Sequence, residues 1–193
     1  MMYLRYLSLL VADLLVNGVS YFLDPVVVLF ADPQGNLPRW LKYFQTHDAT
    51  VDGIGLTGGI EPRFVRQTKF LRDENGNPKN RACRYLCRVA WLYRNNAYGF
   101  GYYVTGAVGP FAQTRSRGDT LEPPTNRYPA RNGYRLEEWR SADRRYFHLW
   151  WVREWGFGKC WEANIGWKIN KYDSRAQFVF RVWPFRSFET KSV

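Results

Sequence analysis

The sequence predicts an α+β fold, in which an antiparallel β-meander of about four to six strands carries an N-terminal apolar helix and one or two further helices packed on one face. Two patterns carry this prediction. From residue 160 to residue 169 polar and apolar side chains alternate, which is the period of a strand with one buried face. Residues 1–23 are apolar except for polar positions at helical spacing. The 193 residues are expected to form a single domain over 1–193.

The apolar segment 1–23 is expected to form a helix with one polar stripe, made of Asp13, Asn17, Ser20 and Asp24. A cleaved signal peptide is disfavoured, because Asp13 and Asn17 interrupt what would be its apolar centre. A membrane span has the required length, although an Asp at mid-depth costs roughly 2.5 to 3.5 kcal/mol on insertion scales. A core helix lying across the apolar face of the meander needs no further assumption, and we expect it; membrane association stays open.

The elements after this helix are expected to be short. Pro25 is predicted to end the helix, because proline lacks the N–H of a helical hydrogen bond. Residues 26–31 are predicted to form a buried strand and residues 32–36 a turn. A two-turn helix that Pro38 can begin follows over residues 37–44. Its apolar side consists of Leu37, Trp40, Leu41 and Phe44, and it can pack on the core or lie on a lipid surface.

Residues 45–53 contain the most site-like side chains. His47, Asp48 and Asp52 lie in this stretch, beside a glycine-rich loop that extends to Gly59. Clustered carboxylates suit a hard cation, and carboxylates with an imidazole suit acid–base hydrolysis, so these three are the candidate catalytic residues. The alternative is that they shape turns, because Asp turns the backbone through its own side chain. We favour the turns.

Basic residues concentrate between Glu61 and Gly118, where there are eleven Lys and Arg and three acids. A helix is predicted over residues 81–95, with arginines on one side. The candidates for anion or nucleic-acid contact in the 61–94 region are Arg63, Arg66, Lys69, Arg81, Arg84 and Arg88, with Arg72 beside them. The plainer interpretation is a solvated basic face. The net charge of +11 fits an acidic partner or simple solubility.

The three cysteines, Cys83, Cys87 and Cys160, do not have the spacing of a disulfide framework. The only imidazoles belong to His47 and His148, and neither is close in sequence to a cysteine. We therefore predict no metal and no cofactor.

The region after the basic helix is expected to be strand and then loop. Residues 98–103 alternate aromatic residues with glycine, and residues 104–108 after them are predicted to form a strand. Aromatic rings on a strand beside the basic helix can stack on bases. Residues 113–133 have no periodicity and contain several prolines, so they are expected to form a long loop insertion.

Residues 146–185 are predicted to form a three-stranded meander. Its strands are 147–152, 160–169 and 176–183, joined by a glycine turn at 156–158 and a polar turn at 170–174. The chain has nine Trp and an aromatic content of 18%, and Trp and Tyr favour sites where one end of the ring is dry and the other wet. The candidate interface or membrane residues are Trp40, Leu41, Phe44, Trp150 and Trp151.

Several segments together resemble a family of small uncharacterised proteins of tailed bacteriophages and prophages. They are Asp24–Asp32, Leu37–Leu41, Phe44–Thr46 with Asp48, Asp52–Gly53, Trp91–Asn95, Ala97–Phe100, Gly166–Lys168, Phe178–Phe180 and Pro184–Phe185. The resemblance spans most of the chain and implies an origin without a mechanism. The family tends to have Pro where this chain has His47 and Asp where it has Ile54.

Nothing in the sequence selects an enzyme class, because it has no nucleophile elbow, P-loop, dinucleotide-binding glycine pattern, metalloprotease helix or kinase signature. We expect a non-enzymatic bacteriophage protein that acts through protein–protein or membrane-surface contacts. It would be cytoplasmic or inner-membrane associated in the host cell, or part of the virion, with phage or host proteins, another copy of itself or a membrane surface as partner. Nucleic-acid binding through the 61–94 region and a small hydrolase centred on Asp48 and Asp52 stay as alternatives.

Overall fold

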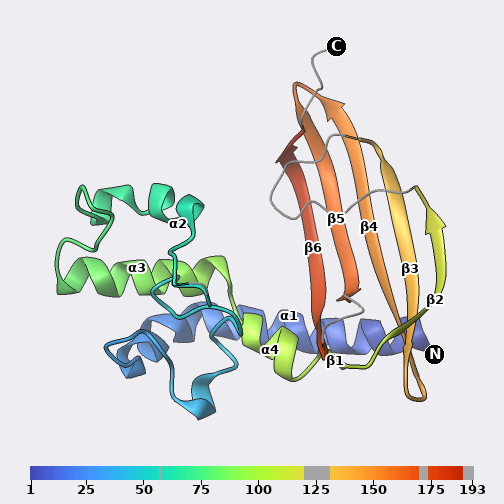
Figure 1. Ribbon diagram of the computed structural model, residues 1–193, viewed down its shortest axis with the longest axis horizontal. Helices are drawn as coiled ribbons and strands as arrows, with labels where there is room; N and C mark the ends of the chain where they lie inside the picture. Colours follow the sequence, from blue (N-terminus) through green and yellow to red (C-terminus); the bar gives the residue numbers. More distant parts are fainter. Residues whose placement is uncertain (57, 120–130, 170–173, 189–193) are drawn as a thin grey trace. The chain divides into compact units, whose positions relative to one another are not determined.

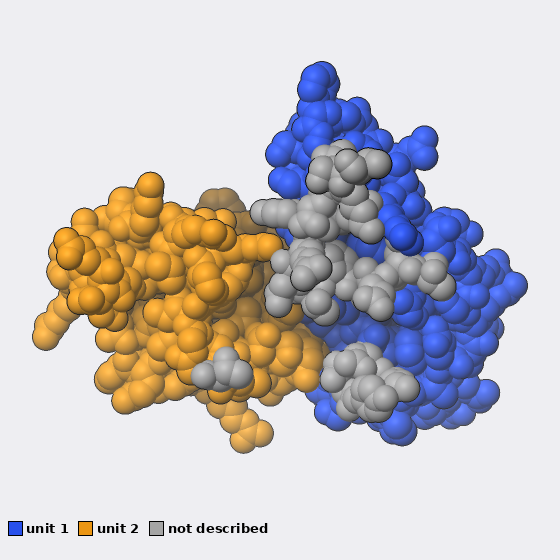
Figure 2. Space-filling model, turned by 45° about the horizontal axis from the view of Figure 1, so that its top comes forward, with its two compact units in different colours: residues 1–10, 105–193 blue, residues 11–104 orange. Residues whose placement is uncertain are grey.

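The computed structural model describes residues 1–193 except 57, 120–130, 170–173 and 189–193. The chain, expected to be a single domain, forms two compact units (Figure 2). Unit 1 consists of residues 1–10 and 105–193, and unit 2 of residues 11–104. Helix α1 (Met2–Val27) contributes its first turns to unit 1 and the rest to unit 2.

Unit 1 is built on an open six-stranded antiparallel sheet, which confirms the α+β class (Figure 1). The strands lie in the order β1-β6-β5-β4-β3-β2. Their bounds are β1 Ala107–Val108, β2 Ala112–Gly118, β3 Gly133–Ser141, β4 Arg144–Gly156, β5 Lys159–Lys168 and β6 Arg175–Ser187. The last three are the strands that the alternating pattern predicts.

The turn between β4 and β5 lies where the glycine pattern predicts it. Phe157 and Gly158 both have positive φ, 55° and 62°, which is the backbone of a two-residue turn that matches the twist of its strands. The turn predicted at 170–174 falls largely outside the described residues.

The predicted loop at 113–133 is wrong in its first part, because β2 occupies residues 112–118 and pairs with β3. Every residue of β2 is exposed, and it lies at the edge of the sheet. An edge strand exposed on both faces needs no apolar period, so its sequence carries no strand signal. Residues 120–130 lie outside the described residues.

The core of unit 1 surrounds Trp167, which is completely buried among Tyr146, Phe147 and Phe178. Tyr6 of α1 packs on these rings, and its hydroxyl donates a hydrogen bond of 2.9 Å to the carbonyl of Val179. Within unit 1 the first turns of the expected covering helix therefore pack on the sheet, and Met2, Leu9 and Leu10 also lie against this cluster.

Unit 2 is mostly helical. It contains the remainder of α1, α2 (Pro62–Gln67), α3 (Arg81–Arg94), α4 (Tyr98–Tyr103) and 3₁₀ turns at Val28–Phe30, Arg39–Leu41 and Lys69–Leu71. Its core includes Val51, Phe64 and Leu92. Helix α3 agrees with the predicted helix at 81–95, and its N-cap is Asn80, whose side chain accepts a hydrogen bond from the Cys83 N–H.

The predicted end of the first helix at Pro25 is wrong, as is the predicted strand at 26–31. Helix α1 continues through Pro25 to Val27, and a 3₁₀ turn follows at Val28–Phe30. A proline removes one backbone donor, and here the burial of Val27 and Val28 in the core of unit 2 keeps the chain helical. The hydroxyl of Tyr85 also donates to the Pro25 carbonyl at 3.1 Å.

Two further local predictions differ from the structure. Residues 37–44 contain only a 3₁₀ turn in place of the predicted two-turn helix. The strand predicted at 104–108 is present only as β1, Ala107–Val108, and residues 98–103 before it form the helix α4. Helix α4 packs closely on the backbone of residues 42–45. Gly99 lies against the backbone carbonyls of Lys42 and Gln45, and the Phe100 N–H donates to the Tyr43 carbonyl at 2.8 Å.

Candidate functional site

The candidate catalytic residue Asp52 is engaged as a structural anion. It is 9% exposed, and its carboxylate accepts hydrogen bonds from Arg88 Nε at 2.7 Å and from Arg84 at 2.8 Å. Burial alone raises the pKa of Asp52, but the hydrogen bonds from Arg88 and Arg84 outweigh burial, so the pKa lies below its usual value. Asp52 therefore holds its loop against α3 as an ionised carboxylate at neutral pH.

The other two candidate catalytic residues, His47 and Asp48, do not line the same pocket as Asp52. The His47 ring stacks on the Tyr102 ring at a centroid distance of 3.7 Å. Asp48 lines a pocket of about 550 Å³, whereas Asp52 lines a different pocket of about 400 Å³. Within the described parts of the chain, no group of three or more His, Cys, Asp or Glu side chains is placed to hold a metal ion. This arrangement favours the turn-forming role.

The basic candidates divide into two groups. Arg88 is buried, and both Arg88 and Arg84 bind Asp52. Arg72 is also buried and donates to Thr68 and to the Gly76 carbonyl. Arg66, Lys69 and Arg81 are exposed, and Arg63 is half-buried. The arginines on α3 therefore do not form one exposed row.

The candidate interface residues also divide. Trp40 is 63% exposed and packs edge-on against the exposed Phe30 ring at 5.5 Å. Trp151 is 37% exposed. Leu41 and Trp150 are buried, and Phe44 packs against the core of unit 2. Trp150 and Trp151 differ because successive residues of a strand face opposite sides of the sheet.

Helix α1 carries a contiguous exposed apolar surface in unit 2. We call it the outer face of α1, and within unit 2 it is formed by Val11, Leu14, Leu15, Val19, Phe22, Val26 and Leu29, the last in the 3₁₀ turn that continues the helix. These side chains are between 52% and 85% exposed. At 3.6 residues per turn they fall within roughly 140° of the helix circumference. In unit 1, Leu4 and Leu7 are also exposed, and their helical spacing places them within the same arc of the circumference.

The polar stripe of α1 lies on the opposite side, where Ser20 is 1% and Asp24 0% exposed. Within the helix, the Ser20 hydroxyl donates to the Val16 carbonyl at 2.7 Å, and the Asn17 amide donates to the Asp13 carbonyl at 2.7 Å. Helix α1 is thus reversed with respect to a surface helix of a soluble protein, because its apolar side faces outwards and its polar side inwards.

Length and composition add to this observation. In the described part of the chain one helical stretch, Met2–Phe30, is long and apolar enough to cross a membrane. Only 11% of the most apolar part of this stretch is buried. A core helix of a soluble protein can have the same length and apolar composition, but most of it is buried. The low burial of α1 therefore differs from what we expected of a core helix.

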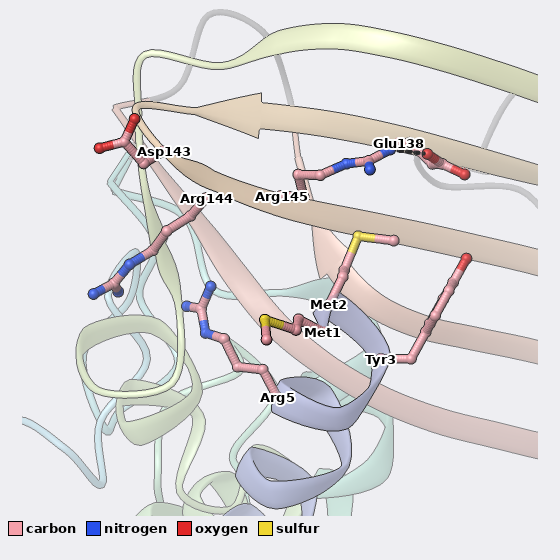
Figure 3. A pocket seen from close by; sticks show the side chains of 8 residues that line it. All are labelled: Met1, Met2, Tyr3, Arg5, Glu138, Asp143, Arg144 and Arg145. Carbon is pink, nitrogen blue, oxygen red and sulfur yellow. Dashed lines mark hydrogen bonds and ion pairs between the residues drawn. The ribbon is translucent and has the colours of Figure 1, made fainter.

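A pocket of about 610 Å³ lies in unit 1 at the start of α1 (Figure 3). Its lining residues are Met1, Met2, Tyr3, Arg5, Glu138, Asp143, Arg144 and Arg145. Arg145 is directed toward Glu138 and forms an ion pair of 3.0 Å with it. The Arg5 guanidinium lies over the rings of Tyr146 and Trp167, at 4.9 and 5.3 Å from their centroids.

The sequence reasoning missed a polar cluster on the sheet. His148 is buried, lies opposite Glu137 of β3 and forms a hydrogen bond of 2.8 Å between Nε2 and Asn164 Oδ1 of β5. Burial lowers the pKa of His148, which keeps the ring neutral. Glu137 accepts from Gln113 at 2.9 Å and from Arg135 at 3.0 Å. The alternation along the strand predicts that His148 lies on the other face of the sheet from Phe147 and Leu149. Only the register of the paired strands shows that Glu137 and Asn164 lie beside it.

The comparisons with known proteins return one family. Residues 1–189 match the model described as "Family of unknown function (DUF7338)". No curated protein and no solved structure shows significant similarity to the chain.

Proposed function

We propose that this chain, which belongs to the family of unknown function DUF7338, is a non-enzymatic protein that associates with a membrane surface through the outer face of α1. The observation that carries the proposal is the reversed polarity of α1, whose exposed side is apolar and whose polar stripe is turned inwards. A contiguous exposed apolar surface needs a cover of lipid or protein.

A lipid surface accounts for the composition of this face. Its side chains are aliphatic or aromatic, and complete burial of each contributes about 1.5 to 3 kcal/mol relative to full exposure. The exposed pair Phe30 and Trp40 follows the end of α1, and aromatic rings favour the depth of the lipid headgroups. The Ser8 hydroxyl, which is exposed, donates to the Leu4 carbonyl at 3.1 Å and so needs no water.

The orientation that we propose is in the plane of the membrane surface. Ser20, Asp24 and Val27 are buried within unit 2, so this side of α1 is held by protein while the outer face is free to enter the lipid. Amphipathic helices of this kind bury their apolar face about 5 to 10 Å deep at the headgroup boundary. The net charge of +11 favours anionic membranes.

The setting of this activity is part of the same proposal. The resemblance to proteins of tailed bacteriophages and prophages supports a bacterial host cell and its inner membrane as the place of action. Detection of the chain in the membrane fraction of expressing cells, retained after a carbonate wash, would support this location, and recovery entirely in the soluble fraction would contradict it.

The direct test is flotation of purified protein with vesicles. The double change Leu14→Glu and Phe22→Glu places two carboxylates on the outer face of α1. We expect binding to fall by at least about tenfold, because each charge costs on the order of 2 kcal/mol or more within the lipid. The control is Leu56→Glu, which adds a carboxylate at a leucine that is 86% exposed and outside α1.

Two results would contradict the proposal. One is a wild-type protein that stays at the bottom of the gradient with vesicles of every composition. The other is a double variant that floats as well as Leu56→Glu does. Circular dichroism of each variant establishes that the fold is retained, so that a loss of binding reports on the surface.

A further inference from the structure

The pocket at the start of α1 has an excess of positive charge. Three arginines and two carboxylates line it. The ion pair between Arg145 and Glu138 balances one charge of each sign, which leaves Arg5 and Arg144 with Asp143. Figure 3 shows the side chains of Arg5 from α1 and Arg144 from β4 projecting into the same space beside Met1.

The Arg5 guanidinium is placed by the aromatic core of unit 1. It lies over the Tyr146 and Trp167 rings, and Trp167 is itself fixed by a hydrogen bond of 3.0 Å from its Nε1 to the Thr105 carbonyl. Among the described residues, no carboxylate forms an ion pair with Arg5. Stacking on aromatic rings orients the guanidinium and leaves its N–H groups available to an anion.

The other wall of the pocket is apolar. Met1, Met2 and Tyr3 line it, and Leu4 and Leu7 are exposed on the next turns of α1. A ligand that fits both walls has an anionic group for the arginines and an apolar part beside them. A planar guanidinium matches the oxygens of a phosphate group in two parallel hydrogen bonds.

We infer that this pocket binds the phosphate ester of an anionic phospholipid headgroup, with Arg5 and Arg144 as its cationic contacts. The inference rests on the proposed function for the lipid as the source of the phosphate. The glycerol and upper acyl carbons of the lipid would lie against Met1, Met2 and Tyr3, beside the exposed Leu4 and Leu7 of the same unit. The site gives the membrane association a preference for anionic lipid.

The experiment has a lipid arm and a soluble arm. In the lipid arm, binding to phosphatidylglycerol-containing vesicles is compared with binding to phosphatidylcholine vesicles. Arg5→Gln and Arg144→Gln should each reduce the advantage of the anionic vesicles about fivefold. The control Arg153→Gln removes an exposed arginine of β4 outside the pocket and should leave the advantage within about twofold of wild type.

In the soluble arm, glycerol 3-phosphate is titrated while the indole N–H signal of Trp167 is followed by NMR. The signal should move in the wild type and in Arg153→Gln and stay in place in Arg5→Gln. Thermal unfolding identifies any variant that has lost its fold. Arg144→Gln, whose side chain is exposed, then serves as the second pocket variant.

The outcomes separate this inference from the proposed function. Equal binding to both vesicle types, with no shift of the Trp167 signal, overturns the inference while flotation by the wild type still supports membrane association. An equal loss in Arg5→Gln and Arg153→Gln also overturns it, because that is the behaviour of diffuse charge. A shift of the Trp167 signal without any anionic preference supports the phosphate-ester site and overturns lipid as its source.

Discussion

Asp24 lies at the end of the inward polar stripe and is the one buried carboxylate of α1. It is completely buried, and in the part of the chain that the structure describes neither carboxylate oxygen has a hydrogen-bond partner. Burial raises the pKa of Asp24 from 3.8 to about 7. The folded protein therefore holds a proton that the unfolded chain releases near pH 4, and stability falls as the pH rises from about 4 to about 7.

The change Asp24→Asn should remove this pH dependence. Between pH 5 and pH 8 the free energy of unfolding of the wild type should fall by up to about 3 kcal/mol relative to that of the variant. Urea denaturation of both proteins at the two pH values measures the difference, since all other groups titrate equally in the two proteins. An identical change with pH in both would show that Asp24 is solvated or paired.

Asp52 presents the opposite case, because its charge is matched by two arginines. Asp52→Ala would leave Arg88 buried without its carboxylate, and we expect a loss of about 3 to 5 kcal/mol in the free energy of unfolding. Asp48→Ala is the matched control and should stay within about 0.5 kcal/mol, because Asp48 is exposed. Because the pKa of Asp52 is lowered, its contribution is present above its ordinary pKa and is lost as the pH falls. Equal stability of the two variants would contradict this assignment.

At the scale of the element, α4 shows how a close approach of backbones decides a secondary structure. The segment 98–103 has the composition of an aromatic strand, yet it forms a helix whose Gly99 touches the carbonyls of Lys42 and Gln45. Only a residue without a side chain allows this contact. Gly99, which looks like a strand interruption in the sequence, is therefore required for the packing of this helix.

Two glycines test this explanation. Gly99→Ala should destabilise the protein by about 1 to 3 kcal/mol, because the added methyl group collides with the backbone at residues 42–45. Gly18→Ala in α1 meets no atom within 4 Å and should stabilise the protein by about 0.5 to 1 kcal/mol, because alanine loses less conformational entropy in a helix. Thermal unfolding of both variants measures this contrast. A neutral Gly99→Ala would contradict the packing explanation.

At the scale of the whole molecule, two separate cores share one continuous helix. Unit 1 buries aromatic rings around Trp167, and unit 2 buries aliphatic and aromatic side chains around Val51, Phe64 and Leu92. Neither core covers the outer face of α1. The proposed membrane association follows from this property of the molecule, because no single residue of α1 requires it.

The candidate site could be predicted from the sequence only in part. The apolar character of α1 and the spacing of its polar stripe are visible in the sequence, whereas only the structure separates the exposed Trp40 from the buried Leu41 among the candidate interface residues. The arginine row of α3 was visible too, but Asp52 lies more than thirty positions away and binds Arg84 and Arg88. Local spacing contains no information about such a partner.

The sequence by itself determined the strands β4, β5 and β6, the helix α3 and the polar stripe of α1, because each depends on a period between neighbours along the chain. Only the tertiary structure decided the direction of the stripe, the helical state of α4 and the strand β2. These depend on contacts between residues far apart in the chain. Burial determines which side of a helix is covered, and burial is a property of the folded chain.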